Sequence, residues 1–442
     1  MLSWVAPGYL GTPQHFASYY QRPIEEGLYE DATNYEQRKS LKVLKALMKD
    51  IEPKVQRKDI SAVKNELKPK VEFVINVGLT NLQFDAYKFF IHSIQNNATD
   101  SDSVPAKNTL DWLNILSLLC DHPAPFLAKL QERHERVGAV TADRANRARS
   151  GSGDDEEDVD VRRLPLPEGL LERENKLFEL IPQKKHVRLS AKMVMIEQIV
   201  LQSRRVGDRV LIFTHWIPVL DYIEEMLRSI KNPALRVGRL DGSTKLETRQ
   251  GITQDMNSGK YDVLLISTTA GGIGLNIYGA NRVIVVDFRY NPANEEQAVG
   301  RAYRLGQPKP VYVYHLLTAG TFEQPLHHIT IFKRQLASRV LDHKNPRRAA
   351  QKSREMLFEP KKVGKEDLDH VRGLDVVLDA VLSTEVGAHV TSITTTDSLH
   401  RDTDEKLTED EEREVEEMRA KMKELKAMAG QAQIAYGGIQ GV

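Results

Sequence analysis

The sequence predicts an α/β protein built on a parallel sheet. Short apolar runs rich in β-branched residues recur through the middle of the chain, and stretches with helix-start signals lie between them. Such runs are typical of strands that are buried on both faces. The runs span residues 209–214, 235–240, 262–267, 282–287 and 311–315. Their alternation with helices implies helices on both faces of the sheet, with ligands beyond the carboxyl ends of the strands.

Two helices carry recognisable start signals, and one further helix is predicted near the end of the chain. Thr244 with Glu247 has the spacing of a capping box, and Asn291–Pro292 supplies a cap followed by proline. Residues 406–428 form an acidic amphipathic stretch whose apolar side chains recur every three or four residues: Val415, Met418, Met422 and Leu425. We expect a solvated helix with a small docking stripe, which makes a protein partner for it possible.

Charge and composition divide the chain. The 442 residues hold 62 Lys and Arg against 62 Asp and Glu, yet residues 181–350 hold 25 bases against 14 acids. The compensating acids gather in residues 154–158 and 401–420. We therefore expect four parts along the chain. They are a mainly helical region (1–130), a disordered acidic linker (131–164), the α/β lobe (165–345) and a disordered tail (346–442).

Several classes of protein are excluded by composition. The single cysteine, Cys120, rules out a disulfide framework and fits a reducing compartment. No membrane span is expected, because the longest uncharged run contains four glycines and polar residues. No metal site is expected either, and zinc in particular lacks a set of ligands with suitable spacing.

A glycine-rich loop follows the run at 262–267. It reads Ser267-Thr-Thr-Ala-Gly-Gly-Ile-Gly-Leu-Asn276. Small hydroxyl residues and glycines let backbone N–H groups approach a phosphate closely. A purely structural tight turn is an equal alternative from these residues alone, and the register of a dinucleotide fingerprint fails.

A second polar group stands on the helix that begins near Asn291. Gln297, Arg301 and Arg304 are spaced i, i+4 and i+7, which places one amide and two guanidinium groups on one helical face. Paired arginines are often simply solvated surface. Here they are expected at the same sheet edge as the glycine loop, and planar guanidinium groups bind phosphate oxygens bidentately.

These segments resemble the Swi/Snf-type DNA-dependent ATPases, a branch of the superfamily-two helicases. Residues 209–216 resemble motif IV, 267–276 motif V and 297–307, with the pattern Gln-x-x-x-Arg-x-x-Arg-x-Gly-Gln, motif VI. Val55-Gln-Arg-Lys-Asp59 is most similar to the ATRX-like branch. The likeness covers roughly residues 1–125 and 185–345. It implies a RecA-like helicase C-terminal lobe, preceded by the mainly helical end of a first lobe, and a location in the nucleus.

The resemblance also implies roles for individual residues. Arg304 would be the arginine finger, with Arg301 beside it on the γ-phosphate, and Gln297 would orient the nucleotide. Thr268, Thr269, Gly271 and Gly272 would face the phosphates of double-stranded DNA or relay their presence to the nucleotide, while Gly274 and Asn276 shape the turn. Arg57 and Lys58 are candidates for a DNA-backbone or inter-lobe contact. His215 and Trp216 either touch DNA or pack a helix onto the sheet.

One departure from the family limits the expected activity. The sequence contains no Gly-x-x-x-x-Gly-Lys-Ser/Thr loop, since Gly259-Lys260 is followed by Tyr261, and no Asp-Glu pair at a strand end. The chain starts about where family members have passed their third motif. We therefore expect ATP with Mg²⁺ to be used only when an N-terminal ATPase lobe completes the protein, and this polypeptide alone to be inactive. The alternative is a non-catalytic DNA-binding or regulatory remnant of a helicase-like protein.

Overall fold

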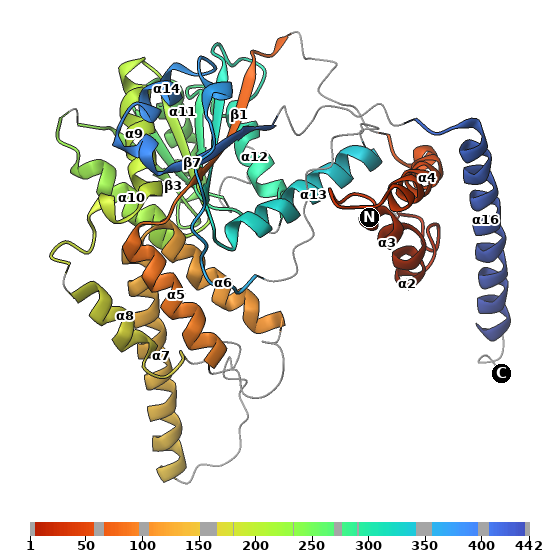
Figure 1. Ribbon diagram of the computed structural model, residues 1–442, viewed down its shortest axis with the longest axis horizontal. Coiled ribbons are helices and arrows are strands. Elements are labelled where there is room, and N and C mark those ends of the chain that lie inside the picture. Colours follow the sequence, from red (N-terminus) through yellow and green to blue (C-terminus); the bar gives the residue numbers. More distant parts are fainter. Residues whose placement is uncertain are drawn as a thin grey trace. The chain divides into compact units, whose positions relative to one another are not determined.

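The computed structural model divides into two compact units, which are described separately (Figure 1). It describes residues 5–56, 66–96, 106–150, 166–179, 181–232, 234–268, 276–289, 291–341, 356–396 and 406–437. The larger unit comprises residues 65–327 and 353–396. The smaller unit comprises residues 1–64, 328–352 and 397–442.

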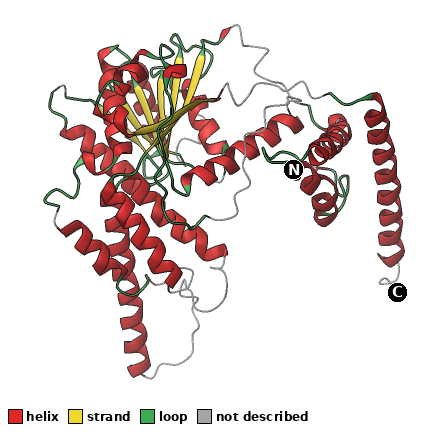
Figure 2. Cartoon of the chain, in the orientation of Figure 1, coloured by secondary structure: helices red, strands yellow, loops and turns green. Residues whose placement is uncertain are grey.

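A seven-stranded sheet forms the centre of the larger unit, in the order β3-β4-β2-β5-β6-β1-β7 (Figure 2). Six strands are mutually parallel, and β7 runs antiparallel to β1. The five predicted strands are confirmed as β2 (Val210–Thr214), β3 (Val237–Leu240), β4 (Val263–Ser267), β5 (Arg282–Val285) and β6 (Val311–Thr318). The predicted α/β fold with a parallel sheet is therefore confirmed.

Both faces of the sheet are buried because alternate strand residues enter two separate apolar cores. Ile212 and Leu265 join one core, whereas Leu211 and Leu264 join the other. The helices of this unit are α5 (Asn81–Asn96), α6 (Ala106–Asp121), α7 (Pro123–Ser150), α8 (Leu170–Glu179), α9 (Ala191–Arg205), α10 (Ile217–Ser229), α11 (Leu246–Asn257), α12 (Ala293–Ala302) and α14 (Val376–Leu382). Residues of α5, α6, α9 and α10 fill the first core, and residues of α11 and α12 enter the second.

Two strands were not predicted as part of this sheet. β1 (Lys70–Val77) pairs with β6 over its whole length, and β7 (Val390–Thr395) pairs with the other edge of β1. Residues 66–130 thus share a sheet and a core with the lobe at 165–345, so the unit boundary near residue 65 differs from the expected boundary at 130. The assignment of residues 1–130 to the end of a first lobe stays a prediction.

Parts of the expected linker and tail form regular elements. Helix α7 continues to Ser150 through the first part of the expected linker, because this stretch is rich in alanine and arginine, which favour helix. Residues 151–164 lie outside the described residues. In the expected tail, α14 and β7 bury Leu378, Val381 and Ile393 in the core of the larger unit. The tail looked unlike a core because these apolar residues are few and lie in short elements.

One of the predicted caps is wrong. Helix α11 begins at Leu246 with Lys245 as its cap, and the Thr244 hydroxyl instead accepts a hydrogen bond from the backbone N–H of Asp241 at 3.1 Å. Thr244 therefore closes the turn after β3 rather than capping the helix. At α12, the Asn291 side-chain oxygen accepts from the N–H of Ala293 at 3.2 Å, so asparagine does act at that helix start.

The smaller unit is helical. Its helices are α2 (Pro13–Phe16), α3 (Arg22–Glu26), α4 (Asn34–Ile51) and α16 (Glu409–Gly437), with the later part of α13 (Glu323–Leu341). Thr33 and Glu36 form a capping box at the start of α4, in which the Thr33 N–H donates to the Glu36 carboxylate at 2.7 Å. Helix α16 contains most of the predicted amphipathic stretch, and Val415 and Met422 on it are buried. The side chain of Leu425 lies outside the described part.

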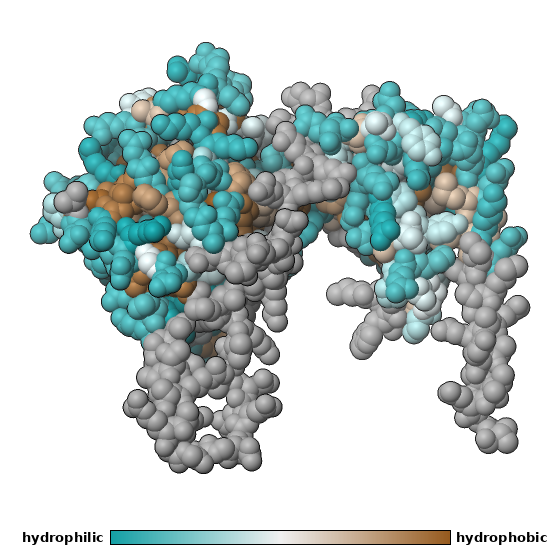
Figure 3. All heavy atoms as spheres, turned by 60° about the horizontal axis from the view of Figure 1, so that its bottom comes forward, coloured by the Kyte–Doolittle hydropathy of each residue, from teal (hydrophilic) through white to brown (hydrophobic). Residues whose placement is uncertain are grey.

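The visible surface is mostly hydrophilic, with scattered apolar residues on the larger unit (Figure 3). The exposed large apolar side chains include Leu246, Tyr278, Leu305 and Val376. Within the described ranges, no helix combines the length and the apolar character that crossing a membrane requires.

Candidate functional site

Three strands end together at the carboxyl edge of the sheet. The Thr268 N–H, after β4, donates to the carbonyl oxygen of Thr214, which ends β2, at 3.0 Å. Asp287, after β5, accepts hydrogen bonds from the Thr214 hydroxyl and from the backbone N–H of His215, the latter at 2.9 and 3.0 Å. The structure thus brings motif IV and the start of motif V together at one edge of the sheet.

Asp287 was missed by the sequence reasoning. It is 3 % exposed, and burial raises the pKa of its carboxyl group, although the hydrogen bond from Thr214 opposes this. A lone aspartate after a strand gives no distinct signal, because many such residues merely begin a turn. Only the pairing of β2 with β5 shows that this carboxylate organises the end of the neighbouring strand.

His215 lies between the end of β2 and the glycine-rich loop. Its ring Nδ1 is 3.0 Å from the hydroxyl of Thr268, and its ring packs edge-on against Trp216. Burial, with the nearby charge of Arg289, lowers the pKa of His215 to about 4, so the imidazole is neutral at pH 7. Trp216 packs against a helix, which was the second of the two alternatives from sequence. Its indole N–H donates to the Ser117 hydroxyl of α6 at 3.1 Å.

Much of the glycine-rich loop lies outside the described residues. This applies to Thr269, Gly271, Gly272 and Gly274, and also to Arg57 and Lys58. The exit of the loop is described, and Asn257 at the end of α11 holds it. Its side-chain amide donates to the Asn276 carbonyl at 3.0 Å and accepts from the Gly279 N–H at 2.8 Å. Asn257 was not among the predicted residues.

The loop exit is tied directly to the arginine helix. The backbone N–H of Ile277 donates to the carbonyl oxygen of Arg301 on α12 at 3.1 Å. On this helix Gln297 is exposed and Arg301 is partly buried. Burial and the positive charge of Arg304 lower the pKa of Arg301, which identifies the two guanidinium groups as electrostatic neighbours. Close like charges of this kind favour binding of an anion.

Arg304 does not share a helical face with Gln297 and Arg301. Helix α12 ends at Ala302, and Tyr303 adopts an extended conformation, so the predicted i, i+4, i+7 geometry is wrong at its last position. Gln307 explains the early end. Its side-chain amide donates to the carbonyls of Ala302 at 3.2 Å and Ala280 at 2.8 Å, which caps the helix and ties it to the start of β5. Arg304 therefore lies exposed in the turn that follows.

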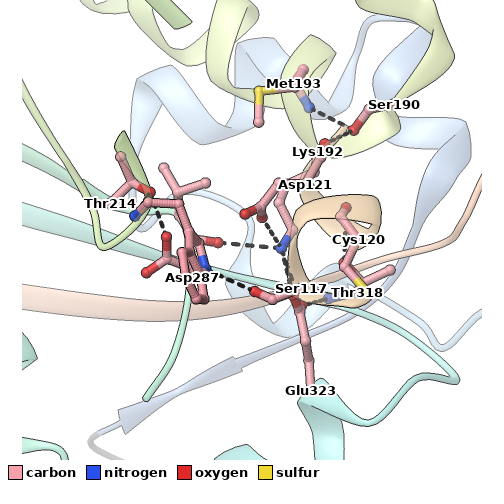
Figure 4. Close-up of polar contacts among 12 residues, drawn as sticks. Ser117, Cys120, Asp121, Ser190, Lys192, Met193, Thr214, Asp287, Thr318 and Glu323 are labelled. Atoms are coloured by element: carbon pink, nitrogen blue, oxygen red, sulfur yellow. Dashed lines mark hydrogen bonds and ion pairs between the residues drawn. The ribbon is translucent and has the colours of Figure 1, made fainter. Parts of the chain in front are cut away.

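A buried ionic cluster contacts the backbone directly after β5 (Figure 4). The Lys192 ammonium on α9 contacts the carboxylates of Asp121 on α6, at 2.9 Å, and Glu323 on α13, at 3.0 Å, and donates to the carbonyl of Val286 at 3.2 Å. All three charged side chains are at most 2 % exposed. Burial alone would lower the pKa of Lys192, but the two carboxylates outweigh it and raise the pKa. The cluster joins three helices to the residue preceding Asp287.

A second buried ion pair fastens the segment 356–396 to the sheet. The Arg282 guanidinium at the start of β5 contacts both carboxylate oxygens of Asp375, at 2.9 and 3.0 Å, and Asp208 at 2.8 Å. Asp375 also accepts from the N–H groups of Val377 and Leu378 and so caps α14. One carboxylate therefore starts a helix and neutralises a buried arginine.

No cluster of three or more His, Cys, Asp or Glu side chains suited to a metal ion occurs within the described residues. The polar groups at the sheet edge include hydroxyl, amide and guanidinium groups beside the single carboxylate of Asp287 and the imidazole of His215. The hydroxyl, amide and guanidinium groups suit phosphate oxygens rather than a metal ion.

Comparison with known proteins identifies two family domains. Residues 191–306 match the helicase conserved C-terminal domain, and residues 1–124 match the SNF2-related domain. The chain is 31 % identical over 378 residues to Protein CHROMATIN REMODELING 20 of Arabidopsis thaliana, covering 81 % of this chain and 25 % of that protein. It is 30 % identical over 344 residues to DNA repair and recombination protein RAD26 of Saccharomyces cerevisiae, covering 77 % of this chain and 27 % of that protein.

Another relative and a solved structure are similar as well. DNA excision repair protein ERCC-6 of Mus musculus is 32 % identical over 351 residues, with 79 % of this chain and 21 % of that protein covered. The Sulfolobus solfataricus SWI2/SNF2 ATPase core in complex with dsDNA matches at a TM-score of 0.43 and 22 % identity, covering 77 % of this chain and 58 % of that one. The chain spans about a quarter of the length of these curated relatives. It belongs to the SNF2-related, Swi/Snf-type family and contains the RecA-like helicase C-terminal domain of that family.

Proposed function

We propose that this chain is the C-terminal motor lobe of an ATP-dependent translocase on double-stranded DNA that remodels chromatin and acts in the nucleus. The hydrogen bond from Ile277 to Arg301 carries the proposal, because it joins the exit of the glycine-rich loop to the helix that bears the first arginine of the pair. A loop suited to DNA phosphates is thereby joined directly to a helix suited to nucleotide phosphates. The names of the relatives, which include a chromatin remodelling protein and DNA repair proteins, support this.

Each polar residue has a proposed role at this edge. Arg304 and Arg301 would meet the γ-phosphate and stabilise the charge that develops during phosphoryl transfer, and Gln297 would orient the nucleotide. Thr268, Thr269 and Gly271 would face the DNA backbone, with Gly272, Gly274 and Asn276 shaping the loop for it. Arg57 and Lys58 would add a backbone or inter-lobe contact. Contacts of this kind hold DNA without reading its sequence.

His215 is proposed as a link rather than a direct ligand. Its neutral ring contacts the Thr268 hydroxyl, while its backbone N–H is held by the buried Asp287 carboxylate. A displacement of the loop at Thr268 would therefore be resisted by the end of β2. Because the residue is partly exposed, its other ring nitrogen can still approach DNA.

The residues present fit only one side of a nucleotide. The exposed Arg304 and Gln297 and the partly buried Arg301 suit phosphate oxygens, but the sequence has no P-loop, and the described residues show no carboxylate group suited to Mg²⁺. ATP with Mg²⁺, when bound, supplies the phosphoryl group whose transfer drives the motor. We propose that an N-terminal ATPase lobe holds these groups, and that the present polypeptide alone turns over no ATP.

Two experiments test the proposal. A titration of duplex DNA at increasing salt should show affinity that falls steeply, since bound phosphates release counterions. A chimera that joins a Swi/Snf-type N-terminal ATPase lobe to this chain should hydrolyse ATP when DNA is present. Arg304→Ala in that chimera should retain DNA binding and lose turnover by ~10³-fold or more. Arg205→Ala, on an exposed arginine of α9, is the matched control, and equal turnover in both variants would refute the role of Arg304.

A second function is favoured by the excess of bases over acids in residues 181–350. The chain would then be a DNA-binding or regulatory module that works without nucleotide through its basic lobe. The same chimera separates the two functions, because a regulatory module would bind DNA yet give no DNA-stimulated ATP hydrolysis when the first lobe is supplied.

A further inference from the structure

The smaller unit pairs a basic helix with an acidic one. Helix α4 carries five bases, Arg38, Lys39, Lys42, Lys45 and Lys49, against the acids Glu36 and Asp50. The first turns of α16, residues 409–417, carry seven acids and one base. The two helices lie against each other within this unit. The charged faces are therefore placed to neutralise one another.

Three ion pairs connect bases of α4 to acids of α16. The Arg38 guanidinium binds the Glu411 carboxylate, with one N–O distance of 2.8 Å. The Lys42 ammonium contacts Glu414 and the Lys49 ammonium contacts Glu416, each at 2.6 Å. The partners advance together along both helices, so α4 and α16 run parallel. With about 100° of turn per residue, positions 38, 42 and 49 fall within roughly 40° of one another, on one side of α4.

An apolar stripe on α16 reinforces the contact. Val415 is fully buried, and Met422 belongs to the same apolar core as Leu44 and Leu47 of α4. Beyond the three ion pairs, Arg419 of α16 contacts Asp50 at 3.0 Å. In this pair the base lies on α16 and the acid on α4, the reverse of the other three pairs. The combination of both arrangements fixes the register of the two helices. Helix α16, expected from sequence to be a solvated helix with a small docking stripe, therefore has a binding surface for that stripe within its own chain.

Two of these three ion pairs have largely exposed carboxylates, whereas Glu411 in the third is 16 % exposed. Glu414 and Glu416 are 55 % and 53 % exposed, and the side chains of Arg38 and Lys49 are also about one third exposed. Exposed pairs gain little energy and lose more of it as salt rises. A polyanion that offers several phosphates at once would compete well with three separate carboxylates.

We propose that α16 is a reversible cover over a DNA-backbone-binding face of α4 formed by Arg38, Lys42 and Lys49. In the covered state, Glu411, Glu414 and Glu416 occupy the positions that DNA phosphates take when α16 is displaced. The three bases span about 16 Å along α4, a length over which one strand of duplex DNA presents several phosphates. The inference rests on the proposed function in one respect, namely that duplex DNA is the polyanion.

The main test weakens the cover without disturbing its apolar stripe. Glu414→Gln with Glu416→Gln is made in the full chain, and the matched control is Glu412→Gln with Glu417→Gln, which makes the same charge change at exposed positions of α16. Binding of a labelled duplex of about 30 base pairs, long enough to cover several helical turns, is measured over a range of salt. We expect at least three-fold tighter binding in the first variant than in the control. The salt slope should steepen by up to about 2, for two additional phosphate contacts.

A second variant releases the helix outright. Val415→Asp places a charge in the buried stripe, and limited proteolysis within α16 reports whether the helix has left α4. Released α16 with tighter DNA binding supports the proposal, and Lys42→Ala with Lys49→Ala in this background should abolish the gain. Released α16 with unchanged affinity and salt slope overturns it.

The outcomes also separate this inference from the proposed function. If the parent chain binds DNA in a salt-dependent way but the release variants bind no tighter, only the cover is refuted. If binding appears only after release, the cover is supported and the loop at Thr268 loses its proposed role in DNA binding. If no variant binds DNA, both proposals fail. Equal binding of polyglutamate and duplex DNA by the released variant would overturn the assignment of DNA as the partner.

Discussion

The two units use charge in opposite ways. In the larger unit, Lys192 and Arg282 each form ion pairs with carboxylates that are almost completely buried. In the smaller unit, the ion pairs between α4 and α16 leave their carboxylates at Glu414 and Glu416 about half exposed. Removing one partner of a buried pair leaves the other charge in a poorly solvated site, whereas the remaining group of an exposed pair is solvated by water. The buried pairs therefore act as fixed contacts, and the exposed pairs suit a contact that opens.

The largest expected effect comes from breaking the buried cluster. Lys192→Met keeps most of the side-chain volume but leaves Asp121 and Glu323 without their ammonium partner, which should lower the free energy of unfolding by about 3–5 kcal/mol. Urea denaturation at pH 7 measures this. Lys260→Met, on an exposed pair with Asp255, is the control and should change little. A small loss at Lys192 would mean that the cluster is not a fixed support for the strand ends.

The next effect concerns pH and His122. The His122 Nδ1 accepts from the Ala124 N–H at 3.0 Å, its Nε2–H donates to the His186 carbonyl at 3.1 Å, and its ring stacks on Tyr222. Burial lowers the pKa of His122 to about 4, from 6.5 for an exposed histidine. The unfolded chain thus binds the proton more readily, so this stability is complete above about pH 6.5 and is lost as the pH falls toward 4.

The magnitude follows from the linkage of protons and folding. Between about pH 6.5 and 5, the loss should reach about 2 kcal/mol, at about 1.4 kcal/mol per pH unit. Urea denaturation of the parent and of His122→Gln at both pH values isolates this contribution, because other groups titrate in both proteins. Parallel pH dependences in the two proteins would contradict a neutral, buried His122.

A smaller effect is expected at the cap of α14. Asp375→Asn removes the charge that faces Arg282 but retains an oxygen for capping, and Arg282 keeps Asp208 as a partner. We expect a loss of about 2 kcal/mol in the free energy of unfolding. Asp375→Ala should cost about 1 kcal/mol more, because it also removes the cap. An equal effect of both variants would show that the cap contributes nothing there.

The smallest effect should occur in the other unit. Lys42→Ala removes one exposed ion pair with Glu414, so we expect less than about 1 kcal/mol, with the difference shrinking as salt rises. Denaturation at low and at high salt tests this. A large loss that does not respond to salt would place this pair with the buried ones and would weaken the contrast between the units.

The sequence predicted best what depends on local pattern. Five strands were predicted correctly because buried parallel strands are continuous apolar runs of β-branched residues. The glycine-rich loop and the arginine helix were noticed because they follow two of these strands. Pairing between distant segments has no such signature. β1 and β7 were therefore not assigned to the sheet, and Asp287 and Asp375 went unnoticed, because the importance of each carboxylate comes from a partner far away in the sequence.

The arginine helix shows a different limit. Helical spacing placed Gln297, Arg301 and Arg304 on one face, and the first two do lie on α12. The helix ends before Arg304 because the Gln307 side-chain amide binds the Ala302 carbonyl, which a longer helix would use for its own backbone. A glutamine several residues beyond the last turn gives no sequence signal of such a cap. The proposed roles of these residues and of the glycine-rich loop stay predictions.

The position of β1 has a consequence for how the protein is made. This strand leaves the ribosome well before its two neighbours, β6 and β7. The sheet therefore cannot be completed until all three have emerged, and pairings between such distant segments form slowly. A fragment that starts at residue 165 would leave one side of β6 as an unpaired edge, a surface prone to aggregation. Production of this lobe for biochemistry should therefore begin before Lys70 and continue beyond Thr395.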